Sequence, residues 1–134
     1  MRPSHHLILS GFALTLLTAA CSGGNALAPK YQPQVTNTPN VVFSFQATGL
    51  QSIDDVVQYT WSCSSGKVII HPATNTTSGT INLVLKDANG AIVYNGTVPA
   101  SGDITPPTGA AGNWTVRVTL TGYTGTINFA VQMQ

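Results

Sequence analysis

From residue 41 onward, apolar and polar side chains alternate along the chain with a period of two. Such alternation is typical of β-strands that bury one face and turn the other toward solvent. The runs that carry it are Val41–Thr48, Val56–Cys63, Thr80–Lys86, Trp114–Leu120 and Thr126–Met133, and a shorter run, Lys67–His71, follows Gly66. The pattern therefore predicts an all-β fold.

Composition favours the same fold class. The 134 residues include no Glu, only 7% are charged, and 43% are hydrophobic. Residues that favour long helices are scarce, whereas β-branched Thr and Val suit a pleated surface. Seven to eight short strands, each with one apolar face, predict an antiparallel β-sandwich of jelly-roll type, and a closed barrel is the alternative.

One hairpin is clearly marked. Ile81, Leu83 and Leu85 share one face of the run that ends at Lys86, and the turn Asp87–Gly90 leads into Ala91–Tyr94. Gly tolerates the left-handed backbone that such turns require, and Asx side chains can bond nearby backbone groups. The Pro- and Gly-containing stretch Ser101–Gly112 is expected to be a long loop.

The start of the chain has the form of an export signal. Arg2 supplies a positive charge, Leu7–Leu17 supplies an apolar run, and small residues precede Cys21. The apolar run is shorter than the roughly 20 residues that a membrane-spanning helix needs. We therefore expect residues 1–20 to be a signal peptide.

The sequence Leu17-Thr18-Ala19-Ala20-Cys21 resembles the lipobox of bacterial lipoproteins. The resemblance implies that Cys21 becomes acylated and is the first residue of the mature chain. Acyl chains, palmitate among them, would then anchor the protein to membrane lipid in the bacterial cell envelope. Ser22 resembles the sorting residue of lipoproteins sent to the outer membrane. There the protein would face either the periplasm or the cell surface.

Residues 21–40 are expected to form a flexible linker. This stretch contains Pro29, Pro33 and Pro39 among small and polar residues and has no hydrophobic period. The folded domain is expected to occupy residues 41–134.

The order of the strand and turn segments resembles that of the bacterial pre-peptidase C-terminal domain. The residues that carry the resemblance are Asp54-Asp55 before Tyr59 and Trp61, Gly66-Lys67-Val68, Leu83–Gly90 and Gly112–Val118. The resemblance implies a β-sandwich found beside secreted peptidases or as a separate envelope module. No peptidase domain accompanies the expected β-sandwich in this sequence, so the resemblance supports the fold prediction more than a prediction of the role.

Charge excludes nucleic acid as a partner. After Cys21 the sequence has four basic residues (Lys30, Lys67, Lys86, Arg117) and four acidic residues (Asp54, Asp55, Asp87, Asp103), so no basic patch is available for phosphate. Cys63 lies in phase with the apolar face of its run and is expected to be buried. An acylated Cys21 leaves it without a disulfide partner.

The sequence offers little catalytic chemistry. His71 lies at a strand end before Pro72, with no nucleophile or orienting acid adjacent in sequence, so we expect no catalytic residue, no enzyme activity and no cofactor. Oxygen ligands at Asp54 and Asp55, or at Asp87, Asn89 and Asp103, match no calcium-loop spacing. The sequence leaves open whether either group binds Ca²⁺, and we predict no other metal site.

Two tyrosines near turns, Tyr94 and Tyr123, are the weak candidates for ligand binding. Trp61 and Trp114 fall on apolar faces and are expected in the core. The sequence thus favours a non-catalytic interaction or structural module that contacts an envelope protein or polysaccharide. The alternative is a dedicated carbohydrate- or polypeptide-binding module.

Overall fold

A computed structural model describes residues 26–134, and within them the protein is all-β with no helix. Six antiparallel strands form one open sheet in the order β1-β2-β6-β4-β5, with β3 also paired to β6. The strands are β1 (Gln34–Thr38), β2 (Val42–Cys63), β3 (Val68–Pro72), β4 (Asn75–Lys86), β5 (Ile92–Gly96) and β6 (Gly112–Met133). The all-β prediction is confirmed.

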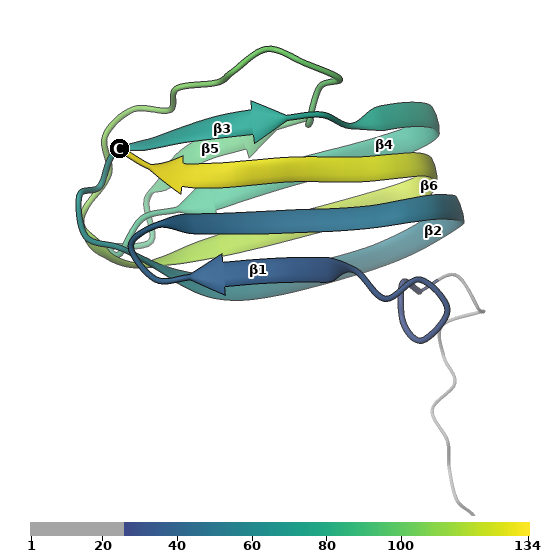
Figure 1. Ribbon diagram of the computed structural model, residues 1–134, viewed down its shortest axis with the longest axis horizontal. Helices are drawn as coiled ribbons and strands as arrows, with labels where there is room; N and C mark the ends of the chain where they lie inside the picture. Colours follow the sequence, from purple (N-terminus) through teal and green to yellow (C-terminus); the bar gives the residue numbers. More distant parts are fainter. Residues whose placement is uncertain (1–25) are drawn as a thin grey trace, which may run out of the picture.

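The strands β2 and β6 are unusually long, at 22 residues each, and they pair from Val42–Gln132 to Cys63–Gly112. The strands β3 and β4 follow one another along the other side of β6. Figure 1 shows these strands turning back at one end, so that the two halves of the sheet lie over each other. Segments expected as separate strands are thus halves of single bent strands, which is why six strands replace the seven to eight expected.

The bend has a local cause. The register of β2 against β6 shifts three times between Ala47 and Asp55, and such irregularities bend and twist a strand. Opposite them, Gly122 and Gly79 adopt φ values of 51° and 76°, and a Cβ at Gly79 would collide with the Gly122 carbonyl. Glycine is therefore required where β4 and β6 turn together.

The core lies between the two halves of the sheet. From one half, Phe43, Phe45 and Phe129 point inward with no exposed surface, and the Phe45 and Phe129 rings stack at 5.8 Å. From the other half, Trp61 and Trp114 meet edge to face at 6.5 Å. These residues and the buried Cys63 lie on the predicted apolar faces, so those assignments are confirmed.

The linker expected at 21–40 is wrong for its described C-terminal part. Residues 34–38 form β1, which pairs with β2 from Gln34–Gln46 to Thr38–Val42, and Leu27 is only 1% exposed. All five residues of β1 are exposed, so the strand shows no buried face and no hydrophobic period. Its backbone pairing, which composition does not reveal, holds it in the sheet.

The predicted hairpin joins β4 and β5, and Gly90 has a φ of 80°. After β5 the chain crosses back toward β3 along residues 97–104 and then runs to β6. This path includes the long loop predicted at Ser101–Gly112. Three contacts attach this crossing segment to β3 and the residues after it: the paired Ile70 and Ile104, the His71–Asp103 contact, and the Thr74 amide bonded to the Pro99 carbonyl. One side of the folded sheet is thereby covered (Figure 1).

Candidate functional site

The four aspartates of the described chain contact backbone amides or a surface histidine. Asp54 accepts a hydrogen bond from the Gly122 amide at 2.7 Å, at the bend. Asp55 accepts bonds from the Leu27 amide at 3.0 Å and from the Val56 amide at 2.8 Å. The pair that the sequence offered as cation ligands therefore holds the bend and the N-terminal segment in place.

Asp87 has the most backbone partners. Its Oδ1 accepts bonds from the amides of Asn89 and Ala91, and its Oδ2 accepts one from Ala110, each at 2.9 Å. The Ala110 bond, followed by those of Ala91 and Asn89, lowers the pKa of this carboxyl although burial opposes the shift. Asp87 thus joins the β4–β5 turn to the loop that enters β6.

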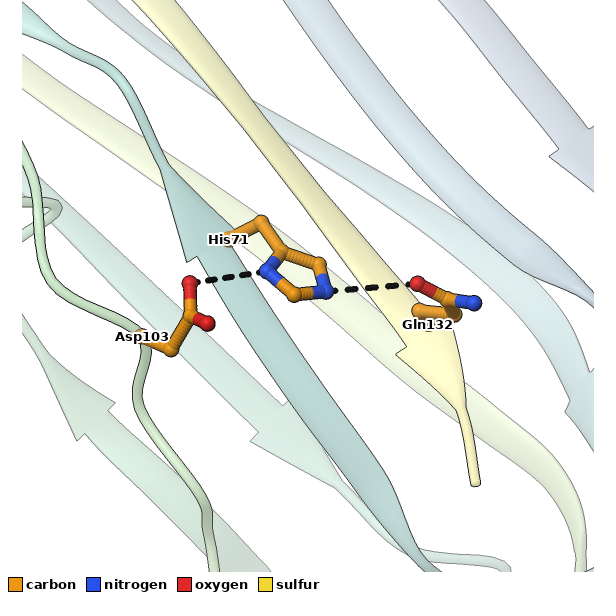
Figure 2. A network of polar contacts seen from close by, with 3 residues as sticks. All are labelled: His71, Asp103 and Gln132. Carbon is orange, nitrogen blue, oxygen red and sulfur yellow. Dashed lines mark hydrogen bonds and ion pairs between the residues drawn. The ribbon is translucent and has the colours of Figure 1, made fainter.

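Among residues 26–134, His71 lies at the centre of a side-chain cluster whose geometry resembles that around a catalytic histidine. Its Nδ1 is 2.8 Å from Asp103 Oδ1 and its Nε2 is 3.2 Å from Gln132 Oε1 (Figure 2). The carboxylate thus orients the ring as an acid orients a catalytic histidine. An amide, however, occupies the position at Nε2 where a hydroxyl or thiol nucleophile would stand.

The His71 cluster is also open to solvent. The side chains of His71 and Asp103 are 40% and 57% exposed. An exposed pair of this kind contributes little to stability and provides none of the water exclusion that strengthens electrostatics in an active site. Its geometry suits a surface contact that joins β3, the crossing segment and β6.

A hollow of about 630 Å³ lies beside this crossing segment. One wall belongs to β4 and the residues just before it, and the other to residues 97–100. The lining includes Thr74, Asn75, Thr76, Asn82, Val98 and Pro99 and contains no charged side chain. We call it the Thr–Asn hollow. Its size falls within the roughly 300–1,000 Å³ of small-molecule sites.

The two tyrosines predicted as ligand contacts lie behind the wall of this hollow. Tyr123 is fully buried, and its hydroxyl accepts a bond from Thr76 at 3.2 Å. Tyr94 is partly buried and donates to the Thr97 carbonyl at 2.6 Å. Burial raises the pKa of both hydroxyls. Each ring supports a residue that lines the hollow, and Tyr123 offers no surface to a ligand.

The residues that line the hollow were missed from sequence. A signal existed in the run Thr74–Thr77, where four successive polar residues interrupt the alternation at the start of β4. Only the return of the chain at residues 97–100 makes this run part of a wall.

Cys21, the predicted lipidation site, lies outside the described residues. Within residues 26–134, no three His, Cys, Asp or Glu side chains are placed to share a metal ion. The same residues contain no helix that could cross a membrane.

No protein-family model matches the chain, and no curated protein matches its sequence.

Proposed function

We propose that the protein is a lipid-anchored lipoprotein of the bacterial cell envelope whose folded part is a non-catalytic interaction module. The observation that carries the non-catalytic role is how the carboxylates are used. Asp54, Asp55 and Asp87 accept bonds from backbone amides, and Asp103 faces a histidine whose other nitrogen meets an amide. Convergent titratable groups are characteristic of active sites, and these groups diverge.

The finer fold assignment belongs to this proposal. We assign the folded-over sheet to the β-sandwiches, with the pre-peptidase C-terminal domain as the family it resembles. Support comes from the aromatic contacts between the two halves of the sheet, where Phe43 and Phe45 pack against Tyr59 at 5.3 Å and 6.2 Å between ring centroids. As a non-catalytic module, the protein would contact its partner through loops and sheet edges.

The position of Leu27 limits the length of the tether. Cys21 lies only six positions before Leu27, which is buried and whose amide is bonded to Asp55 beside the bend. Six residues span at most about 20 Å when fully extended. An acylated Cys21 would therefore hold the bent end of the sheet close to the membrane.

The anchor is tested by the mass of the N-terminal peptide of the full chain, expressed in a bacterium and recovered from its membrane fraction. We expect the peptide to begin at Cys21 and to carry the mass of added acyl chains. The variant Cys21→Ser should lose both the acyl mass and membrane recovery. An unmodified wild-type peptide in the soluble fraction would refute the anchor.

The Thr–Asn hollow favours a second candidate function, the binding of a neutral carbohydrate or polypeptide. It is uncharged, offers hydroxyl and amide groups, and has the volume of a ligand site. Thr80→Arg would fill it, whereas Thr60→Arg places the same group on an exposed residue of β2. Retention on an immobilised polysaccharide or peptide that is lost in Thr80→Arg alone would support this candidate, and equal retention of both variants would refute it.

A further inference from the structure

The strand β1 is a sheet edge on which the Thr38 carbonyl, bonded by the Trp61 indole and the Val41 amide, is the one backbone group given a partner outside the backbone pairing with β2. It ends the hydrogen-bonded order of the sheet and pairs with β2 alone among the described strands (Figure 1). Its five residues, Gln-Val-Thr-Asn-Thr, are all exposed and include no charge and no proline. Its register with β2 is uninterrupted. Natural edge strands are usually protected by Lys, an internal Pro or a bulge.

Other edges of this sheet are protected. The Asn37 side chain donates to the Thr60 carbonyl, and the Asn40 amide donates to the Ser62 carbonyl, so two backbone groups of the second half of β2 are covered. Ile104 pairs with Ile70 on β3. The first half of β4 contains two register shifts against β6, and the pairing of β5 with β4 contains a third register shift. The contrast singles out β1.

We propose that β1 pairs in antiparallel orientation with β1 of a second copy of this protein. A two-fold axis at Thr36 would place Thr36 opposite Thr36, Val35 opposite Asn37 and Gln34 opposite Thr38. No like charges would oppose each other, and Thr–Thr pairs are favourable across strands. Pro33 and Pro39 flank the strand and limit the pairing to this segment.

The charge of the described chain also permits self-association. Its four basic residues (Lys30, Lys67, Lys86, Arg117) balance its four aspartates, so two copies carry no net repulsion. A five-residue edge buries less than the roughly 1,000 Å² expected of a stable interface, so the pairing is weak in free solution.

A shared membrane would raise the effective concentration of the two edges. The two-fold axis runs perpendicular to the sheet, so both N-terminal segments lie at the same height above a membrane when the sheet lies parallel to that membrane. This strengthening rests on the proposed lipid anchor, whereas the pairing itself does not.

The test is disulfide trapping in the full chain. Thr36→Cys places a thiol on the two-fold axis, and Thr60→Cys is the matched control on an exposed position of β2. After mild oxidation of membranes, we expect Thr36→Cys to yield several-fold more cross-linked dimer than Thr60→Cys or wild type. Membrane and soluble fractions are read separately, so that loss of the anchor and loss of the pairing are distinguished.

Charged substitutions at Thr36 test the same contact between the two copies of β1. Thr36→Lys and Thr36→Asp, each in differently tagged copies that keep wild-type circular dichroism, should each abolish chemical cross-linking of like copies. Coexpression of the two should restore it between unlike copies. Equal trapping of Thr36→Cys and Thr60→Cys, or unchanged cross-linking in the charged variants, would overturn the proposal. A ladder of larger species would also overturn it, because a two-fold contact closes at a dimer.

Discussion

The pleated body of the protein and the segments that cover its sides are held by different forces. The body consists of β2, β6 and the successive strands β3 and β4, and its inward faces are almost entirely apolar. The covering segments, residues 26–33 and 97–111, bury few apolar side chains and are attached largely through polar contacts, among them Leu27–Asp55, His71–Asp103 and Ala110–Asp87. Burial of apolar area is distributed over many residues, whereas such contacts depend on single atoms.

The difference explains which parts tolerate change. Because the body is stabilised by buried apolar area spread over many residues, it can accept many conservative apolar substitutions with small losses in the free energy of unfolding. A covering segment attached at a few points can detach as a unit when one of those contacts is lost. The proposed functional features, the Thr–Asn hollow and the edge of β1, lie in or beside these covering segments.

The largest effect is expected in the body, from Trp114→Ala. The side chain has no exposed surface, packs against Trp61, and donates to the Ala110 carbonyl at 2.8 Å. Its removal should lower the free energy of unfolding by about 3–5 kcal/mol. Urea unfolding followed by circular dichroism measures this. The control Val56→Ala, at a position 48% exposed, should stay within about 0.5 kcal/mol of wild type.

Leu27→Ala tests whether the N-terminal segment belongs to the body. Leu27 is 1% exposed, so its truncation should lower the free energy of unfolding by about 2–3 kcal/mol. Gln32→Ala, at an exposed position of the same segment, should change it by less than about 0.5 kcal/mol. Equal, small effects in both variants would mean that this segment does not contribute to the fold.

Asp87→Asn tests a polar attachment through its pH dependence. The pKa of Asp87 is lowered in the fold, so its contribution is complete above the unfolded value of about 3.9 and declines as pH falls through the folded value. Wild type should therefore exceed Asp87→Asn in stability at pH 6, and the gap should narrow below about pH 4. Thermal unfolding across this range measures the gap, and a gap independent of pH contradicts the assignment.

The smallest effect is expected from Asp103→Ala. Because both partners of the His71–Asp103 contact are well exposed, its loss should lower the free energy of unfolding by at most about 1 kcal/mol. Hydrogen exchange should nevertheless quicken locally in residues 97–104, the segment that this contact helps to attach. If hydrogen exchange instead quickened equally throughout the chain and the free energy of unfolding fell by several kcal/mol, the contact would be part of what holds the whole fold together.

The comparison also shows what could be read from sequence. Alternation located the inward residues of the body, including Trp61, Trp114 and Cys63, because period two follows directly from the pleat. It could not join Val41–Thr48 to Val56–Cys63, since the bend hides the continuity of hydrogen bonding. The attachment points Asp55 and Asp87 looked like cation ligands because sequence shows a carboxylate and not the amides that surround it.

The candidate site was the least predictable part. Tyr94 and Tyr123 were chosen for their nearness to turns, yet they support the hollow from behind. Its lining comes from two segments brought together by the crossing of residues 97–104, a long-range contact that no local pattern encodes. The strand β1 escaped notice for a related reason, because a fully exposed strand buries no face that could create a period.

The most direct test of the short tether, and of β1 as part of the folded sheet, is protease trimming of the full chain in intact membranes, followed by mass measurement of the stable fragment. The account predicts a fragment that begins at or before Leu27 and retains β1. A stable fragment that begins at residue 39 or later would contradict it, because β1 would then be part of a flexible linker.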